Sequence, residues 1–290
     1  MKPEILILTP VYNDWQNLHK LLDQINRIFA ENIKDNFNLV VVDDNSTEKI
    51  DINNFKFSKI KKIKLIKLSK NVGSQRAIAI GLKYIKNFYI KNYKTIIIDS
   101  DGQDNPIGII QMFKKINANP DRSIVAKRDQ RKEPLWFKIF YEIYNFGLTF
   151  FTLKKIRYGN FSFLNDNDVN KILLDDGLWN AFPPTVSKNL KNINHIILDR
   201  EKRFSGDSKM NFFELIYHAL RIFSVLRFRV FFLSLFYSIV CYIVFFGQSA
   251  LFFYLVLFLL ILLNLNNFIL TYSCKKKFEK EFKNIEIFEF

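Results

Sequence analysis

The N-terminal part of the chain alternates short apolar runs with longer segments of helical periodicity. Four runs rich in β-branched residues, each followed by polar residues that favour turns, predict strands at residues 5–8, 39–42, 63–68 and 96–98. Between them, residues 14–29 and 75–88 carry apolar side chains at the spacing of one helix face. Strands that alternate with helices form βαβ units, so the pattern predicts an α/β fold with a mostly parallel sheet flanked by helices.

A different pattern begins near residue 211. Apolar residues recur at helical spacing through 211–229, and the run 230–274 contains no charged residue. A helix needs about 20 apolar residues to cross the hydrocarbon core of a bilayer. The run therefore predicts two transmembrane helices, at about 230–246 and 250–270, joined by a turn at Gly247. A buried hairpin in a soluble core is the alternative, which the density of Phe and Leu disfavours.

Basic residues flank both outer ends of this run, at Arg227 and Arg229 before it and at 275–277 after it. The positive-inside rule then places both ends in the cytoplasm. We expect a cytoplasmic α/β domain at 1–210, a juxtamembrane amphipathic helix at 211–229, the two spans within 230–274 and a basic cytoplasmic tail at 275–290. The aromatic segment 136–151 is a second candidate for an interfacial helix, with packing on the sheet as the alternative.

Composition supports a membrane protein. Apolar residues make up 49% of the chain and Phe alone contributes 32, which is too apolar for disorder and rich in Phe for a soluble enzyme. The formal charge of +15 suits a polyanionic partner, either nucleic acid or an anionic membrane. The absence of a recognised nucleic-acid motif favours the membrane. Cys241 and Cys274 offer neither a disulfide framework nor metal-ligand spacing, and no signal peptide precedes the first predicted strand.

Acidic residues stand at the ends of several predicted strands, where open sheets of this kind bind ligands. Asp99 and Asp101 follow the fourth strand, and Asp14 and Asp43-Asp44 follow the first two. Two carboxylates one residue apart can both reach a hard cation such as Mg²⁺ or Mn²⁺, which often bridges protein carboxylates to substrate phosphates. These positions predict a metal and phosphate site at the carboxyl edge of the sheet.

Five segments, in this order, resemble glycosyltransferase family 2, which has the GT-A fold. Within that family they are most similar to the polyprenyl-phosphate sugar transferases, the group of dolichyl-phosphate mannose synthase. The segments are residues 9–14 (TPVYND), 42–46 (VDDNS), 71–73 (NVG), 99–104 (DSDGQD) and 203–209 (RFSGDSK). The first four are shared by the whole family. The last, with the two predicted spans, indicates the lipid-phosphate branch.

The resemblance implies a role for each matching residue. The nucleoside pocket would be lined by Pro10, Tyr12, Asp14 and Asp44, with Asp44 accepting hydrogen bonds from the base. Donor binding would also involve Asn71 and Gly73, for which a plain turn is the alternative. Mg²⁺ or Mn²⁺ on the donor diphosphate would be held by Asp99, Asp101 and Gln103. The phosphate charge of the donor would be neutralised by Arg203 and Lys209. The phosphate of the acceptor would be neutralised by Arg128 and Arg131, with a solvated surface charge as the alternative for Arg131.

The sequence departs from the branch at two places. Asp14 replaces the usual glutamate and keeps the acid, whereas Asn160 and Ser162 replace an acidic residue and an arginine near the last strand, which leaves acceptor handling open. The implied reaction is an inverting transfer from a UDP- or GDP-sugar to a polyprenyl phosphate. It would take place at the cytoplasmic face of a bacterial inner or plasma membrane. The sequence is compatible with a homo-oligomer of this chain.

Two other functions remain open from the sequence. One is a family 2 transferase that acts on a hydroxyl of a cell-surface glycan or lipid, for which Asp104 would be the general base. The other is a non-catalytic membrane protein that binds nucleotide-sugars. A lipid phosphate is already anionic and needs positioning more than a base, which agrees with the lack of a histidine at a predicted strand end.

Overall fold

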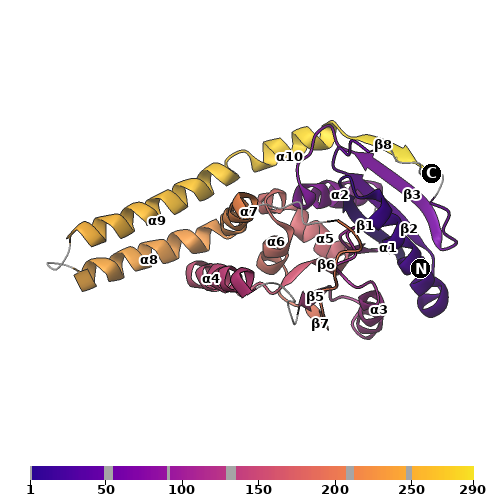
Figure 1. The fold of residues 1–290 in the computed structure, drawn as a ribbon, viewed down its shortest axis with the longest axis horizontal. Helices are drawn as coiled ribbons and strands as arrows, with labels where there is room; N and C mark the ends of the chain where they lie inside the picture. Colours follow the sequence, from indigo (N-terminus) through magenta and orange to yellow (C-terminus); the bar gives the residue numbers. More distant parts are fainter. Residues whose placement is uncertain (1, 49–54, 90–91, 129–134, 207–211, 246–249) are drawn as a thin grey trace.

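A mixed eight-stranded sheet forms the centre of the molecule (Figure 1). The computed structural model describes residues 2–48, 55–89, 92–128, 135–206, 212–245 and 250–290. The strand order is β7-β5-β6-β4-β1-β2-β3-β8. The strands are β1 (Glu4–Val11), β2 (Phe37–Asp43), β3 (Ile60–Lys67), β4 (Tyr93–Ile97), β5 (Ile124–Arg128), β6 (Tyr158–Asn165), β7 (Asn194–Leu198) and β8 (Glu286–Glu289).

The four predicted strands are confirmed as β1 to β4, which pair in parallel, as expected from the βαβ pattern. The two predicted helices are confirmed as α1 (Trp15–Ile28) and α2 (Ser74–Phe88). The sheet is only mostly parallel, because β6 lies antiparallel between β4 and β5, and β8 lies antiparallel to β3. The antiparallel β6 brings its first residues to the edge at which the parallel strands end.

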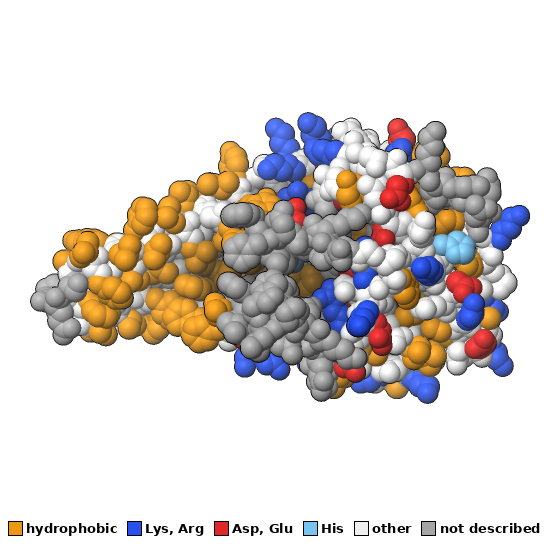
Figure 2. All heavy atoms as spheres, viewed as in Figure 1, with side chains coloured by type: hydrophobic (Ala, Val, Ile, Leu, Met, Phe, Trp, Pro, Cys, Tyr) orange, Lys and Arg blue, Asp and Glu red, His pale blue; other side chains and the backbone are white. Residues whose placement is uncertain are grey.

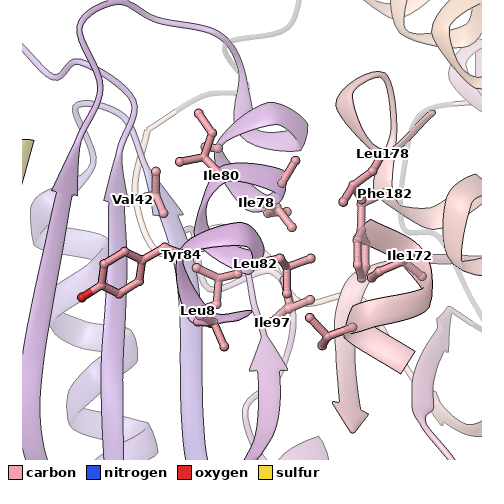
Figure 3. Close-up of a cluster of buried hydrophobic side chains, with 14 of the residues drawn as sticks. Leu8, Val42, Ile78, Ile80, Leu82, Tyr84, Ile97, Ile172, Leu178 and Phe182 are labelled. Atoms are coloured by element: carbon pink, nitrogen blue, oxygen red, sulfur yellow. The ribbon is translucent and has the colours of Figure 1, made fainter. Parts of the chain in front are cut away.

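Helices cover both faces of the sheet. On one face lie α1, the π-helical turn η1 (Phe29–Ile33) and α3 (Gly108–Ala118). On the other lie α2, α5 (Asp166–Leu173), the 3₁₀-helix η3 (Asp176–Trp179) and α6 (Phe182–Asn189). Figure 3 shows this second core, where Leu8, Val42 and Ile97 of the strands meet α2, and Leu178 and Phe182 close it from the side. Both layers are apolar and buried, so the sheet is a rigid platform for its carboxyl edge.

Two long apolar helices project from this domain (Figure 1). They are α8 (Arg227–Phe245) and α9 (Ala250–Thr271), and both are long and apolar enough to cross a membrane. The share of their most apolar windows that is buried is only 17% and 11%, unlike in a core helix of a soluble protein. Figure 2 shows the projection covered with hydrophobic side chains, while charged side chains gather over the sheet domain. We describe α8 and α9 as candidate membrane spans.

The helices next to the candidate spans differ from the expectation in where they end and in what they contact. The expected juxtamembrane helix at 211–229 is divided in the structure, because α7 (Phe212–Val225) ends before α8 begins at Arg227. The second expected interfacial helix is α4 (Leu135–Thr152), whose last turn packs on α8. There the ring of Phe150 stacks on Tyr237 with centroids 4.2 Å apart, and the Tyr237 hydroxyl donates to the Phe150 carbonyl at 2.7 Å.

The segment expected to be a basic cytoplasmic tail folds back onto the domain. It forms α10 (Cys274–Lys283), in which Phe278 stacks on Trp179 of η3, followed by β8 at the edge of the sheet. The basic residues of this segment did not indicate a return, because the residues that pair with the domain are acidic and aromatic. Glu281 pairs with Lys70 at 2.6 Å, and Glu289 pairs with Lys64. Residues 274–289 therefore belong to the same folded body as the sheet.

Candidate functional site

The carboxyl edge of the sheet gathers most of the polar residues that the sequence singled out. An ion-pair cluster joins three of its segments. Arg203 pairs with Asp14, which follows β1, and its Nη1 lies 3.6 Å from Oδ2 of Asp101, which follows β4. Asp14 is held from its other side by Asn17, whose Nδ2 donates to Oδ1 at 2.7 Å. One guanidinium thus lies between two carboxylates that are far apart in the sequence, as the planar fork of arginine allows.

The loop after β4 is tightly turned. Oδ1 of Asp101 accepts from the backbone N–H of Gln103 at 3.0 Å, and the carbonyl of Asp101 accepts from the N–H of Phe204 at 3.2 Å. Between them Gly102 has a φ of +76°, and a Cβ at this position would lie 2.3 Å from the Phe204 ring. Only glycine combines this φ with so close an approach of a ring. The 203–205 segment therefore forms a cover over the D-x-D loop.

Asp99 is oriented by a chain of side-chain amides. Nδ2 of Asn160, near the start of β6, donates to both carboxylate oxygens of Asp99, at 2.9 and 3.1 Å. Oδ1 of Asn160 accepts from Nε2 of Gln75 at 2.9 Å, and Oε1 of Gln75 accepts from the N–H of Phe182 at 2.8 Å. Asn160 and Gln75 are both buried. Since each amide has its oxygen and nitrogen fixed by the next, the direction of the Asp99 carboxylate is set by α2 and α6.

The two aspartates after β2 hold neighbouring loops. Asp43 Oδ1 accepts from the N–H of Ser46 at 2.8 Å, while Asp44 accepts from the N–H groups of Val72 and Gly73 at 2.7 and 2.8 Å. Burial raises the pKa of the Asp44 carboxyl to about 6, and the two backbone donors oppose that rise. Asp44 therefore fixes the 72–73 turn, where Gly73 has a φ of +90°. Its expected contact with the base stays a prediction.

Other predicted residues are placed less centrally. Pro10 is buried within β1, and Tyr12 is exposed just beyond it. The side-chain oxygen of Gln103 accepts from Arg200, so it would have to leave this arginine in order to bind a metal. Asp104 is buried and forms an antiparallel bridge with Arg200. Asn71 is exposed next to the Gly73 turn.

Three predicted cations cannot be placed at the site. The backbone of Arg128 ends β5 and pairs with Leu198, but its side chain lies outside the described residues. Lys209 and Arg131 lie wholly outside them. The histidines are elsewhere: His19 contacts Phe55 and Phe57, His195 lies on β7 and His218 on α7.

Sequence reasoning missed three residues that shape this edge. Asn160 was interpreted as a lost charge, whereas it is a direct partner of Asp99. Gln75 lies two residues after the predicted 71–73 turn, and this closeness was the available signal. Arg200 comes from the end of β7, and no pattern in the sequence indicates that β7 lies near β4.

The donor set suits a divalent cation that arrives with a phosphate. Asp99 and Asp101 offer carboxylate oxygens at one loop, and Mg²⁺ and Mn²⁺ prefer such ligands. Within the described ranges no group of three or more His, Cys, Asp or Glu side chains could hold a metal ion. Two carboxylates would therefore need phosphate oxygens and water to complete the coordination, as is common for Mg²⁺ on phosphate substrates.

Comparison with known proteins agrees with this arrangement. The model of the family described as glycosyl transferase family 2 matches residues 6–178, which include β1 to β6 and the D-x-D loop. An uncharacterized glycosyltransferase of Synechocystis sp. is 26% identical over 240 residues, covering 76% of this chain and 68% of that protein. The uncharacterized glycosyltransferase YkcC of Bacillus subtilis is 30% identical over 133 residues, which are 46% of this chain and 39% of YkcC.

Among solved structures, glucosyl-3-phosphoglycerate synthase from Mycobacterium tuberculosis has the same fold. Its complex with Mn²⁺, UDP and glucosyl-3-phosphoglycerate superposes with a TM-score of 0.54 at 12% sequence identity. The superposition covers 79% of this chain and 80% of the mycobacterial chain. A likeness at this identity shows the fold, and it confirms the predicted GT-A-type architecture.

Proposed function

This chain belongs to glycosyl transferase family 2, and we propose that it transfers a sugar from a nucleoside diphosphate donor to a polyprenyl phosphate at the cytoplasmic face of a membrane. The observation that carries the proposal is the ion pair between the D-x-D loop and Arg203, a side chain suited to phosphate, in a domain that also bears two candidate membrane spans. An apolar anchor on a transferase suits an acceptor that is itself held in the bilayer.

We assign donor binding to the loops after β1, β2 and β4. Asp14 and Asp44 would frame the nucleoside, with Pro10 and Tyr12 beside it and the Asn71–Gly73 turn held by Asp44. Arg203 would exchange part of its contact with Asp14 and Asp101 for the donor diphosphate, with Lys209 as a second cation. The existing ion pairs keep the guanidinium in place until phosphate arrives, which lowers the cost of ordering it.

Asp99 and Asp101 would hold Mg²⁺ or Mn²⁺ against the diphosphate. A divalent ion there supplies charge neutralisation for the leaving nucleoside diphosphate. The mycobacterial structure with Mn²⁺ and UDP supports this assignment. Asn160 and Gln75 would keep the Asp99 carboxylate in the orientation that the ion needs, and Gln103 is a third candidate ligand once released from Arg200.

The described histidines lie away from this site, and a lipid phosphate acceptor needs no histidine as a general base. Its oxygen is already anionic, so this chain needs to position it and to balance its charge. Arg128 at the end of β5 is the cation we assign to this task, with Arg131 after it. Asp104 is the residue that would act as base if the acceptor were a hydroxyl.

We propose that the 1–210 domain and the returning segment 274–289 lie on the cytoplasmic side, with α8 and α9 crossing the bilayer. Both outer ends of this hairpin meet the same domain: α7 leads into α8, and α9 continues into α10 on η3. Basic residues at both ends agree with this orientation. The helices α4 and α7 would lie at headgroup level.

The test uses the purified full chain in detergent with Mg²⁺ or Mn²⁺, a panel of UDP- and GDP-sugars and a short polyprenyl phosphate. We expect metal-dependent release of nucleoside diphosphate and a lipid product heavier by one sugar. Both should be lost in Asp101→Ala and kept in Asp23→Ala, which removes an acid on the exposed side of α1.

Two results would contradict the proposal. Diphosphate release without a sugar-phosphate lipid would move the acceptor to a hydroxyl, and Asp104→Asn would then abolish turnover. Metal-dependent nucleotide binding without any transfer, across the whole panel, would favour a non-catalytic nucleotide-sugar-binding protein.

A further inference from the structure

An arginine outside the donor site is buried without an acidic partner. Arg221 on α7 is 8% exposed, and its Nη2 donates to the carbonyl of Trp179 at 3.1 Å. Its guanidinium lies over the Tyr217 ring, 5.9 Å from the centroid, and its Nε is buried with no hydrogen-bond partner. In the described parts of the chain no Asp or Glu forms an ion pair with Arg221. A single carbonyl and one ring are weak compensation for a buried charge.

A second guanidinium converges on the same carbonyl. Arg76, in the first turn of α2, directs its Nε to the Trp179 oxygen at 3.4 Å and lies over the Trp179 ring at 5.1 Å from the centroid. Burial, together with the positive charge of Arg76, lowers the pKa of Arg221 to about 10. The charge of Arg76 also acts on Asp44, whose pKa it lowers, but both carboxylate oxygens of Asp44 already accept hydrogen bonds from the 72–73 turn. Two like charges thus share one neutral acceptor.

The titratable neighbours of Arg221 add no negative charge, although Asp44 lies near Arg76. His218, one turn before Arg221, has its pKa lowered to about 4 by burial and by Arg221, so it is neutral at pH 7. Burial raises the pKa of the Cys274 thiol, which is therefore uncharged as well. Capping the last carbonyl of η3 needs one donor and no charge. The pair of guanidiniums is therefore unexplained by the packing of α7 alone.

We propose that Arg76 and Arg221 form a binding site for a phosphate group where α2, η3 and α7 meet. Two arginines that converge with free N–H groups match the several oxygens of a phosphate, which would supply the missing negative charge. Nη1 of Arg76 also donates to the Val72 carbonyl at 3.5 Å, so the site adjoins the 72–73 turn. Bound phosphate would join α7, which leads into the first candidate span, to α2 of the catalytic domain.

The position of the site allows two sources for this phosphate. Ser224, one turn after Arg221, accepts from Asn180, which also donates to the carbonyl of Leu270 near the end of α9. The arginine pair therefore lies beside the ends of both candidate spans that adjoin the sheet domain. A phospholipid headgroup is within reach there if these helices cross the membrane. A free phosphate from solution has the same chemistry.

The test measures the thermal unfolding midpoint of the full chain in detergent against inorganic phosphate, with chloride keeping the ionic strength constant. We expect a saturable rise for the wild type and an apparent affinity at least about tenfold weaker in Arg221→Gln, since one charge-assisted pair is lost. Glutamine can still donate to Trp179, so without phosphate this variant should unfold no earlier than the wild type. The control Arg27→Gln, whose arginine has its own partner Asp23, should respond like the wild type.

The source is identified in nanodiscs of phosphatidylcholine with and without phosphatidylglycerol. Stabilisation by phosphatidylglycerol that Arg221→Gln and Arg76→Gln both lose assigns the site to a lipid headgroup, and stabilisation by inorganic phosphate alone assigns it to a free anion. The proposal is wrong if the wild type responds to neither, or if Arg221→Gln keeps the full response. Should Arg221→Gln fail to fold, Arg76→Gln and Arg221→Lys carry the same comparison. No sugar donor is present, so the outcome is independent of the transferase assay.

Discussion

At the scale of single residues, the site depends on groups that touch no substrate in the proposed reaction. Asn160 holds both oxygens of Asp99, and Gln75 holds Asn160. Partners of this kind set the direction and basicity of a metal-binding carboxylate. Asn160 is a position at which the sequence departs from the polyprenyl-phosphate branch. In the structure it supports Asp99 of the D-x-D loop, so we expect the departure to act on donor binding.

Replacing Asn160 should weaken metal binding without unfolding the domain. We expect Asn160→Ala to lower Mn²⁺ affinity about 10–100-fold, the usual cost of losing such a partner. Asn160→Asp should lose less affinity than Asn160→Ala, because the new carboxylate can itself bind Mn²⁺ although it no longer donates to Asp99. Free Mn²⁺ measured by electron paramagnetic resonance, with no donor present, checks both.

The matched control is Asn189→Ala, which removes another asparagine–aspartate hydrogen bond, to Asp175 at 2.7 Å, away from the site. Gln75→Ala should shift Mn²⁺ affinity in the same direction as Asn160→Ala, by less. Equal Mn²⁺ affinity in Asn160→Ala and Asn189→Ala would show that Asp99 needs no orienting partner.

Asp44 should make stability depend on pH. Its pKa is about 6 in the folded protein against an ordinary 3.8, so the folded state binds this proton more tightly than the unfolded chain. The contribution of Asp44 to stability is therefore largest below about pH 4 and is lost as the pH rises to about 6. Two pKa units correspond to about 3 kcal/mol at most.

Unfolding midpoints of the wild type and Asp44→Asn from about pH 3.5 to about pH 7, a range that spans both pKa values, measure this dependence. We expect the difference between the two proteins to change across that window, because asparagine does not titrate. Asp35→Asn, which removes a half-buried acid paired with Lys2, should run parallel to the wild type. Parallel curves for Asp44→Asn as well would mean that folding does not change the pKa of Asp44.

At the scale of secondary-structure elements, the returning segment joins the candidate spans to the sheet. Strand β8 pairs with β3, and Ile63 and Phe290 exchange backbone hydrogen bonds of 3.0 and 2.9 Å. Helix α10 adds the Phe278–Trp179 stack and the Lys83 ammonium over the Phe278 ring at 5.0 Å. The spans are therefore attached to the domain through both ends of the hairpin.

Removing residues 285–290 should expose the edge of β3 while leaving α10 in place. We expect the amide of Ile63 to lose protection from hydrogen exchange, because its acceptor, the Phe290 carbonyl, is gone. Glu289→Gln is the matched control, since it removes only the ion pairs with Lys62 and Lys64 and keeps the strand. Protection of Ile63 that survives the truncation would show that β8 does not pair in solution.

The first half of the fold could be predicted because its periodicity is local. Strands β1 to β4 alternate with α1 and α2, and the rule for parallel sheets then places Asp14, Asp44 and Asp99 at one edge. The other contributions depend on sheet order. Strand β6 reaches this edge only because it runs antiparallel between β4 and β5, and no local signal indicates where Asn160 or Arg200 will lie.

The C-terminal return could not be predicted for a related reason. Residues 286–289 form a short strand whose side chains are all exposed, so it has no alternation that would distinguish it from a tail. Its place is fixed by a free sheet edge at β3 and by acidic partners for a lysine-rich strand. Both are properties of the folded domain.

At the scale of the whole molecule, an apolar hairpin projects from a charged α/β domain. Both outer ends of the hairpin are packed on that domain, through α7 and α10. A hairpin that crosses a bilayer twice must have its two ends on one side, and the positive charges at these ends favour the cytoplasm. The packing of both ends on one domain and the charges beside them therefore both support the proposed topology.

This topology predicts which positions share a side of the membrane. In a background with Cys241→Ser and Cys274→Ser, we expect Lys276→Cys on α10 and Lys202→Cys after β7 to react with a membrane-impermeant maleimide from the same, cytoplasmic face. Both lysines are exposed, so labelling reports sidedness and not burial. Ser249→Cys, between the two helices, should react only from the opposite face. Labelling of Ser249→Cys from the cytoplasmic face would mean that the hairpin lies along the membrane surface, and labelling of Lys276→Cys opposite to Lys202→Cys would exclude the packing of α10 on the domain.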